Sequence, residues 1–250
     1  MQEIEFKFQV PVKKRKALQK AFTLLKAEPI HLAAQYFDTA DQTLAKHCIA
    51  IRRRQENDEW KQTFKAVDTA KVLSRLELEF DIAPPETTTL DLDNYKKDYS
   101  AIYKKLKRAL GLPLPTLELL FETNIQRLRV LQDVGNSTVE IALDIGKIFK
   151  EQNSVDIFEI EFELKQGSIE DLIAFIRPWV QKYQLTLDTH SKSDYGLLAV
   201  RQQSSFSAQY QTPLVLNRSS SEVEALQSIV ANCLQHLLPN ASSIARQQYS

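Results

Sequence analysis

The sequence predicts an α+β fold, an antiparallel barrel or sandwich of strands covered by amphipathic helices. Three observations carry this prediction. Apolar and polar residues alternate with period two along about eight segments, as expected of strands whose two faces differ. Short turn signals join several of these segments, which favours antiparallel neighbours. Longer segments between and after them have apolar residues at helical spacing instead.

The first strand is predicted over residues 2–10 and ends at Pro11. Its alternation places apolar and charged side chains on opposite faces, with Ile4, Phe6 and Phe8 on one and Glu3, Glu5 and Lys7 on the other. Residues 12–27 are predicted to follow as an amphipathic helix. Further strands are predicted near 32–38, 48–56, 59–66 and 74–83, before Pro84 and Pro85 close the run.

In the second half of the chain, predicted helices flank three more strands. Residues 92–110 are expected to form an amphipathic helix with Gly111 just past its end. The strands lie near 117–132, 137–149 and 155–165, and GNS at 135–137 predicts a hairpin between the first two. Ser168 and Asp171 are at the N-cap and capping-box positions of a helix over 168–184. A polar linker over 202–212 then leads to a last helix over 219–238.

Composition limits the possible partners and compartment. The 250 residues include 32 Lys+Arg and 32 Asp+Glu, so the net charge indicates no nucleic-acid or membrane partner. Cys48 and Cys233 lie far apart, which argues against a disulfide scaffold and fits a reducing cytoplasm. The N-terminal residues are charged where a signal peptide is apolar, and no stretch approaches the roughly 20 apolar residues of a membrane span. We therefore expect a cytoplasmic protein.

Charged residues of both signs recur on one face of most predicted strands, because residues of equal parity share a side. Strand by strand they are Glu3, Glu5 and Lys7; Arg52 and Arg54; Lys65; Arg75, Glu77 and Glu79; Arg127 and Arg129; Glu140 and Asp144; Glu159, Glu161 and Glu163. The opposite parity is apolar, as at Ile51, Phe64, Ile141 and Phe162. This pattern fits a solvated exterior, or an inverted barrel with charge in its lumen and apolar residues under helices. The residues alone leave both interpretations open.

An inverted barrel of this kind would suit a polyphosphate and a metal ion. Charge in a lumen is costly unless it is paired or bound to a ligand. Arginine presents a planar fork of donors to phosphate oxygens. Mg²⁺ and Mn²⁺ prefer oxygen ligands and bridge proteins to substrate phosphates. Cations on one wall and carboxylates on another therefore indicate a polyphosphate–metal site.

The ordered set of motifs resembles the CYTH family, the triphosphate tunnel metalloenzymes. The resemblance begins with Glu3-x-Glu5-x-Lys7 and continues through YFDTADQTLAKHCIAIRRR at 36–54. It then runs through Thr63-x-Lys65, Arg75-x-Glu77-x-Glu79, Arg127, EIALDIG at 140–146, FEIEFEL at 158–164 and SKSDYG at 191–196. Each motif is weak alone, but the ordered set is specific, and it covers about residues 1–201.

The resemblance implies an eight-stranded antiparallel β-barrel, a tunnel with a charged lumen. Its basic residues would bind a triphosphate substrate, namely Lys7, Arg52, Arg54, Lys65, Arg75, Arg127, Arg129 and Lys192. Its carboxylates would hold Mg²⁺ or Mn²⁺, namely Glu3, Glu5, Glu159 and Glu161, with Glu163, Glu140 and Asp144 close by. The catalytic residues would be Glu5, Lys7, Arg54, Glu161 and Lys192.

The activity expected from the resemblance is metal-dependent hydrolysis of inorganic triphosphate to pyrophosphate and phosphate. The alternatives are a thiamine triphosphatase or an adenylate cyclase on the same fold, or a non-catalytic polyphosphate-binding module. Residues 213–250 resemble the start of a CHAD domain. We therefore expect a tunnel domain over 1–201, a linker over 202–212 and a helical extension over 213–250. Both a monomer and a homodimer stay open.

Overall fold

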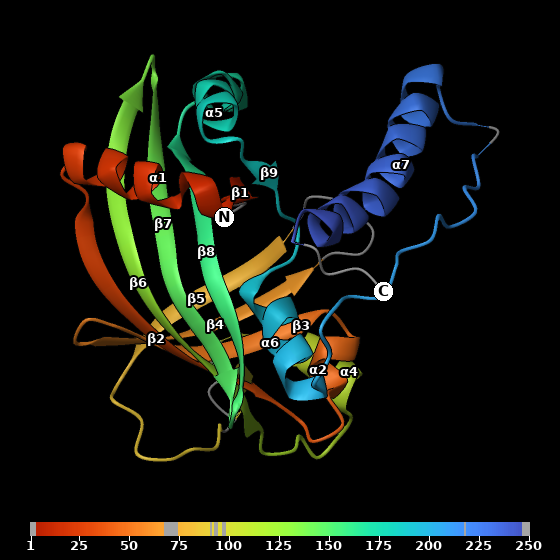
Figure 1. Ribbon diagram of the computed structural model, residues 1–250. Coiled ribbons are helices and arrows are strands. Elements are labelled where there is room, and N and C mark those ends of the chain that lie inside the picture. The colour runs from red at the N-terminus through yellow and green to blue at the C-terminus, as the bar shows by residue number, and fades with distance from the viewer. Residues whose placement is uncertain are drawn as a thin grey trace.

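One curled antiparallel sheet forms the body of the molecule. The computed structural model describes residues 4–67, 75–90, 92, 95–96, 99–217 and 219–246, and for Val67 and Arg75 the backbone alone. Nine strands follow the order β5-β4-β3-β2-β6-β7-β8-β1-β9, and every neighbouring pair is antiparallel. The sheet curls so that β3, β4 and β5 cross behind β6, β7 and β8 (Figure 1). The predicted α+β class is confirmed.

The strands lie close to the segments predicted for them. They are β1 (Glu5–Gln9), β2 (Glu28–Asp38), β3 (Ile49–Glu56), β4 (Glu59–Val67), β5 (Arg75–Ile82), β6 (Glu118–Val134), β7 (Ser137–Lys150), β8 (Asn153–Gln166) and β9 (Thr186–Leu187). Gly135, with φ of 60°, and Asn136 form the turn between β6 and β7 that the hairpin signal predicted. The structure adds β9 to the strands expected, and no ladder among the described residues joins the edge strands β5 and β9.

Six helices accompany the sheet in the part of the chain that the structure describes. They are α1 (Val12–Leu24), α2 (Thr43–Lys46), α4 (Ser100–Leu110), α5 (Ile169–Tyr183), α6 (Lys192–Arg201) and α7 (Glu222–Ala245). Ser168 caps α5 as predicted, with its Oγ accepting a hydrogen bond from Asp171 N at 3.2 Å. Of the helix predicted over 92–110, the structure describes α4 from Ser100 onward and a helical backbone at Tyr95 and Lys96, while residues 93–94 and 97–98 lie outside the described residues. The sequence did not predict α2 or α6.

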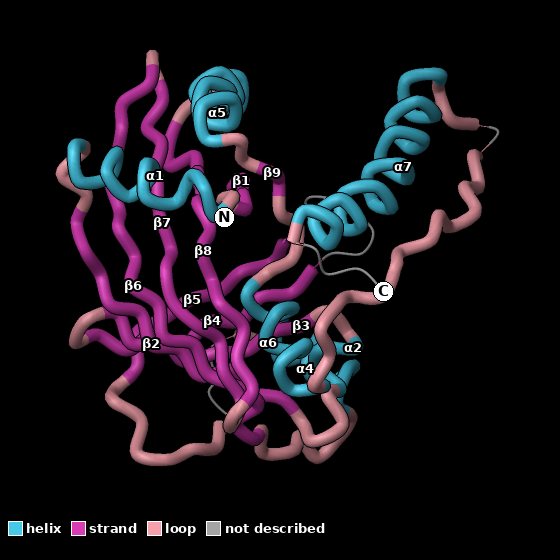
Figure 2. The backbone as a smooth tube through the Cα atoms, viewed as in Figure 1, coloured by secondary structure: helices cyan, strands magenta, loops and turns pink. Residues whose placement is uncertain are grey.

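The apolar parity of the strands faces outward and is buried under helices. Phe162 of β8 is fully buried in a cluster with Phe22 of α1 and Leu172 of α5. Phe64 of β4 is fully buried in a second cluster with Leu106 of α4. Figure 2 shows α1 lying across β6, β7 and β8 on this outer side. The charged parity therefore lies on the concave side, so the inverted arrangement is the one that the chain adopts.

Helix α6 fills one end of the concave side. Its Tyr195 and Leu198 are buried in an apolar cluster with Tyr36 of β2 and Phe121 of β6. A Cβ on Gly196 would overlap the ring of Phe121, so only glycine allows α6 to approach the sheet this closely. The concave side is consequently apolar at the end that α6 occupies and charged beyond it.

Helix α7 extends away from the sheet and contacts it near β9 (Figure 1). The described residues between Arg201 and Ser221 form no helix or strand. Apolar side chains near the start of α7 are largely exposed, with Val223 at 64% and Leu226 at 61%. Among the described residues, no helix has both the length and the apolar character required to span a membrane. The division into a tunnel domain, a linker and an extension stays a prediction.

Candidate functional site

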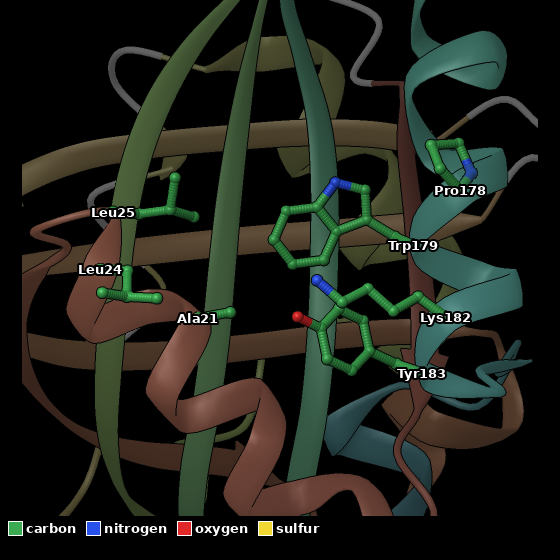
Figure 3. Close-up of a pocket in the computed structure, with 7 residues that line it drawn as sticks. All are labelled: Ala21, Leu24, Leu25, Pro178, Trp179, Lys182 and Tyr183. Atoms are coloured by element: carbon green, nitrogen blue, oxygen red, sulfur yellow. The ribbon is translucent and has the colours of Figure 1, made fainter.

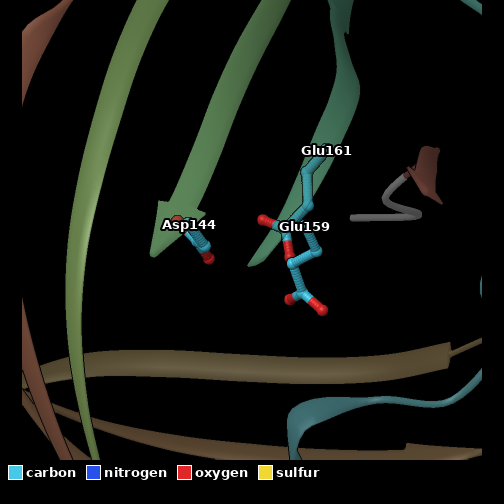
Figure 4. Close-up of side chains that lie close together, drawn as sticks. All are labelled: Asp144, Glu159 and Glu161. Atoms are coloured by element: carbon cyan, nitrogen blue, oxygen red, sulfur yellow. The ribbon is translucent and has the colours of Figure 1, made fainter. Parts of the chain in front are cut away.

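Three carboxylates meet on the charged part of the concave side, and we call them the carboxylate triad: Asp144 of β7 and Glu159 and Glu161 of β8. Each offers an oxygen within 4.8 Å of the others. The β7–β8 ladder pairs Asp144 with Glu159, and the period of two puts Glu161 on the same face. Figure 4 shows the three side chains projecting to one side of the sheet. Asp144 and Glu159 are fully buried, and Glu161 is 9% exposed.

Three cations from different elements surround the carboxylate triad. Lys192 Nζ, at the start of α6, lies 2.7 Å from Asp144 Oδ2, 2.5 Å from Glu159 Oε1 and 2.8 Å from Glu161 Oε1. Arg127 of β6 binds Asp144 through two parallel hydrogen bonds of 2.7 Å each. It also donates to Glu161 Oε2 at 2.5 Å. Lys7 Nζ of β1 lies 3.4 Å from Glu159 Oε2.

These contacts keep the cluster ionised despite its burial. Burial alone would raise the pKa of Glu161, but Lys192 and Arg127 hold it well below its usual value. Burial also opposes the charge of Asp144, and the same two cations lower its pKa. Conversely, burial disfavours the Lys192 ammonium, but Asp144, Glu159 and Glu161 hold its pKa well above the usual value. The site therefore holds alternating buried charges at neutral pH.

The carboxylate triad fits a hard divalent cation. All three donors are carboxylate oxygens, which Mg²⁺ and Mn²⁺ prefer, and they are close enough to share one ion. Glu159 Oε1 is buried and forms no hydrogen bond within the described residues, although Lys192 approaches it as an ion-pair partner. The Lys192 ammonium thus occupies the position among these oxygens that a metal ion would need.

A second group of cations lies on β3 and β4. Arg52 Nη1 donates to Tyr36 Oη at 3.3 Å, and Lys65 Nζ lies 2.9 Å from Glu77 Oε2. Burial raises the pKa of Tyr36, yet Arg52, Lys192 and Lys65 together lower it below the usual value. Cations of β3, β4 and α6 therefore act together on the hydroxyl of Tyr36.

Arg54 of β3 belongs to the same group of cations. Its Nη2 lies 3.3 Å from Glu79 Oε2 of β5 and 3.4 Å from Glu56 Oε2. Burial, followed by the charge of Arg52, nevertheless lowers the pKa of Arg54, and Arg127 of the opposite wall adds to the effect. A bound anion would relieve this repulsion. We refer to Arg52, Arg54 and Lys65 as the basic wall.

The remaining predicted carboxylates lie outside the triad. Glu140 and Glu163 face each other across β7 and β8, and Lys165 Nζ lies 3.6 and 2.7 Å from their carboxylates. Glu5 is exposed on β1 opposite Glu163, and its charge helps to raise the pKa of Arg127. Glu5 thus acts electrostatically on Arg127, whereas Lys165 forms ion pairs with Glu140 and Glu163.

Three more predicted site residues lie at the rim of the site or at the limits of the described part of the chain. Arg129 Nη2 lies 3.1 Å from Glu28 Oε2, and its side chain is 35% exposed at the rim. Arg75 begins β5, but its side chain lies outside the description, and Glu3 lies outside the described residues altogether. The structure therefore brings together Lys7, Arg127, Lys192 and the carboxylate triad most closely.

Sequence reasoning missed the residues that hold Lys7. Lys7 Nζ donates to His190 O and lies 3.9 Å from Asp188 Oδ2. Both partners follow β9, whose two residues are too few to show any period. The only signal in the sequence was that Asp188 and His190 immediately precede the SKSDYG motif.

An apolar groove lies elsewhere, between α1 and α5 on the outer side of the sheet (Figure 3). It is lined by Ala21, Leu24, Leu25, Pro178, Trp179, Lys182 and Tyr183. None of the predicted site residues lines it, so this groove is separate from the charged concave side.

Fold and site together define a class of protein, a curled antiparallel sheet whose concave side opposes a basic wall to buried carboxylates. The chain belongs to the CYTH family, whose CYTH domain matches residues 1–195. It is 33% identical over 202 residues to an inorganic triphosphatase of Haemophilus influenzae, an alignment that covers 79% of this chain and 55% of that protein. The chain thus spans about half the length of this curated relative.

Two solved structures share the fold. A Hippeastrum protein, described as a candidate adenylyl cyclase with a dominant triphosphatase activity, has a TM-score of 0.54 at 20% identity, covering 80% of this chain and 96% of that one. A candidate adenylate cyclase from Bacillus halodurans has a TM-score of 0.52 at 20% identity, covering 76% and 94%. At such identities the likeness shows the architecture only.

Proposed function

We propose that this chain hydrolyses inorganic triphosphate to pyrophosphate and phosphate, with Mg²⁺ or Mn²⁺ held by the carboxylate triad. The observation that carries the proposal is the opposition of two walls on one concave side. Three buried carboxylates offer oxygens within 4.8 Å of one another, and the cations Arg52, Arg54 and Lys65 lie on β3 and β4. The Haemophilus influenzae relative, named an inorganic triphosphatase, supports the same reaction.

The basic residues would bind and orient the substrate. Arg52, Arg54 and Lys65 offer donors to phosphate oxygens along one wall, and Arg127 offers them from the other. Because phosphoryl transfer depends mainly on positioning and charge neutralisation, such a lining supplies most of what the reaction needs. When bound, a divalent cation would supply further neutralisation of phosphate charge.

Lys192 would exchange one set of partners for another. Its ammonium contacts all three members of the carboxylate triad, the oxygens that would hold the cation. Like charges repel strongly at such distances in a buried site. Lys192 would therefore turn from the carboxylates to a phosphate oxygen, while Arg127 keeps Asp144 in place through its two hydrogen bonds.

Phosphate release from tripolyphosphate, measured with Mg²⁺, with Mn²⁺ and with EDTA, tests the proposal. We expect EDTA to abolish release and Glu161→Gln to reduce it about 100-fold or more, because charge stabilisation is the main catalytic contribution. Glu122→Gln is the matched control, since Glu122 accepts a hydrogen bond from Gln35 at 3.1 Å on the opposite face of β6. Release that ignores EDTA and survives Glu161→Gln would overturn the proposal.

The same assay decides the substrate. Thiamine triphosphate and ATP are compared with tripolyphosphate at equal concentration, and cyclic AMP is measured in the ATP reaction. We expect tripolyphosphate to be preferred, because the Haemophilus influenzae relative is named an inorganic triphosphatase. Cyclic AMP from ATP would instead assign a cyclase, and tight binding without turnover under either metal would assign a binding module. The cytoplasm is the compartment that we propose for this activity.

A further inference from the structure

Asp188 is a buried carboxylate that lies outside the carboxylate triad and contacts Lys7. It is 4% exposed and lies directly after β9. Its backbone N–H donates to Lys7 O at 2.8 Å, and its Oδ2 lies 3.9 Å from Lys7 Nζ. Tyr195 Oη of α6 donates to the same Oδ2 at 2.9 Å, and His190 N donates to Oδ1 at 3.0 Å. Asp188 thus fixes both the backbone and the ammonium of Lys7.

The last two turns of α7 enclose the segment that contains Asp188. Ser242 Oγ accepts a hydrogen bond from Thr189 N at 3.1 Å, and its single proton has two acceptors in reach, Leu238 O of α7 at 2.9 Å and Leu187 O at 3.2 Å. Ser242 O also accepts a bond of 2.9 Å from Gln9 Nε2, two residues beyond Lys7 on β1. The backbone of Thr189, next to Asp188, and the side chain of Gln9 on β1 are therefore both bonded to the same residue of α7.

Two further contacts extend this enclosure. His190 Nε2 lies 3.2 Å from Pro239 O and 3.3 Å from Ser243 Oγ. Arg246 Nε lies 4.0 Å from Asp188 Oδ2, and its guanidinium carbon lies 3.9 Å from the centroid of the Tyr195 ring. Arg246 thus contacts the carboxylate that faces Lys7 and the ring that donates to it. We call Pro239, Ser242, Ser243 and Arg246 the α7 clamp.

We infer that the α7 clamp and Asp188 are positioning elements for Lys7, so that the C-terminal helix helps to assemble the phosphate-binding site. This inference rests on the proposed function, in which Lys7 binds a phosphate. The polar contacts of α7 to the sheet end on β1 and on residues 187–190, which are the residues that hold Lys7. The earlier turns of α7 instead leave Val223 and Leu226 exposed.

The consequence for binding is specific. If Asp188 and Arg246 only stabilised the fold, their loss would lower the amount of active protein and leave KM unchanged. Because they set the position of an ammonium that contacts substrate, their loss should weaken binding more than turnover. Arg246→Lys retains the charge near Asp188 and should restore part of the affinity, although lysine lacks the planar group that lies over Tyr195.

The experiment compares Arg246→Ala, Arg246→Lys, Asp188→Asn and Ser242→Ala in the full chain, with Leu226→Ser of the exposed part of α7 as control. We expect Arg246→Ala and Asp188→Asn to raise KM for tripolyphosphate about threefold to tenfold, with a smaller change in kcat. Arg246→Lys should lie between these and the unsubstituted chain, and Leu226→Ser should match the unsubstituted chain.

A second measurement is independent of activity. Hydrogen exchange at the Asp188 amide, which donates to Lys7 O, should accelerate about tenfold or more in Arg246→Ala and Ser242→Ala, while the amides of β7 stay protected. Unchanged KM and unchanged exchange in all clamp variants would overturn the inference. If the unsubstituted chain fails to hydrolyse tripolyphosphate, the proposed function falls. Faster exchange at Asp188 would then still support the clamp, and unchanged exchange would remove it as well.

Discussion

In the proposed function, the ammonium of Lys192 competes with a metal ion for the carboxylate triad. Its ammonium lies 2.5 to 2.8 Å from oxygens of all three triad carboxylates. A lysine in that position balances the carboxylates in the ligand-free chain, which removes much of the cost of burying them. The same lysine opposes the entry of a second cation.

We therefore predict that Lys192→Met tightens the binding of Mn²⁺ in the absence of substrate, while it slows hydrolysis. Removing the competing charge should lower the Kd for Mn²⁺ by roughly threefold to tenfold, as expected for a close charge pair in a partly screened site. Calorimetric titration of the substrate-free protein measures this. Weaker binding of Mn²⁺ in Lys192→Met would show that the ammonium does not compete for the triad.

Glu161 links the site to stability at acid pH. Its pKa in the folded chain lies well below the usual value, because Lys192 and Arg127 outweigh the effect of burial. A lowered pKa adds stability that is present above the unfolded pKa and is lost as pH falls through the folded pKa. Asp144 contributes with the same sign.

We predict that the free energy of unfolding, measured with urea in EDTA, falls from about pH 6 to about pH 3 and falls less steeply in Glu161→Gln. The substitution removes one of the carboxylates that must be protonated on acidification. Glu122→Gln again serves as the control. Equal slopes for Glu161→Gln and the unsubstituted chain would mean that Glu161 is not held ionised by its partners.

At the scale of single residues, the sequence predicted which face of a strand a side chain occupies. It did not predict which side chains form ion pairs with one another. Parity placed Asp144, Glu159 and Glu161 on one side, because the period of a strand is two. Parity does not indicate where along a strand the site lies. It therefore could not distinguish these three carboxylates from Glu163, which pairs with Lys165 instead. Asp188 follows a strand of two residues, which is too short for a period of two to indicate the face of its neighbours.

Among the elements, α6 connects the apolar end of the concave side to the charged part. Tyr195 and Leu198 pack against the sheet, and Lys192 of the first turn enters the triad. Ser191 and Asp194 form a capping box that fixes where α6 begins. The position of the Lys192 ammonium therefore depends on how closely α6 approaches Phe121.

We predict that Gly196→Ala destabilises the fold by about 1–3 kcal/mol, the usual cost of overpacking a core. The added methyl would overlap the ring of Phe121 and push α6 outward, so hydrolysis should also fall. Thermal unfolding and phosphate release measure the two effects. Arg201→Ala, at the exposed end of α6, is the control and should retain both properties. Full activity in Gly196→Ala would show that the position of the Lys192 ammonium does not depend on how closely α6 packs against Phe121.

The sequence predicted the long elements and missed the short ones. The strands β6, β7 and β8 are 17, 14 and 14 residues long, which is enough for a period of two to be recognised over part of each. In α6 the continuous apolar run from Leu197 to Val200 has no period, so neither a strand nor a helix was favoured. The run is explained by the packing of α6 against β6, β7 and β8, a contact that distant residues create.

For the molecule as a whole, the two charged walls predict a response to ligand. Arg54 is buried and lies under the repulsion of Arg52 and Arg127, and the triad holds a lysine where, in the proposed function, a metal would bind. Tripolyphosphate and Mn²⁺ together should relieve both, and anything that binds only the folded state stabilises it.

We predict that the pair raises Tm by about 5–10 °C at a ligand concentration about 100 times Kd, since such binding contributes about 2.7 kcal/mol. Each ligand alone should give a smaller shift. Thermal denaturation with tripolyphosphate, with Mn²⁺ and with both measures this, and Glu161→Gln should lose the extra shift of the pair. Strictly additive shifts in the unsubstituted chain would indicate two independent sites.

The sequence alone could not decide between a solvated exterior and an inverted barrel. The two arrangements have the same alternation, and they differ only in which face the sheet curls around. That curl depends on pairings between distant segments, such as β1 with β8 and β2 with β6. The family resemblance, drawn from the ordered motifs, supplied what local patterns could not.

The pairing of β1 with β8 also has a consequence for how the chain is made. β1 is synthesised before the other strands of the sheet, yet its partner strand β8 is synthesised only after most of them. Until then its backbone groups have no ladder, and Phe6 and Phe8 have no core to enter. Lys7 can therefore meet Glu161 only when nearly the whole sheet exists, which makes closure of the phosphate site a late event in folding.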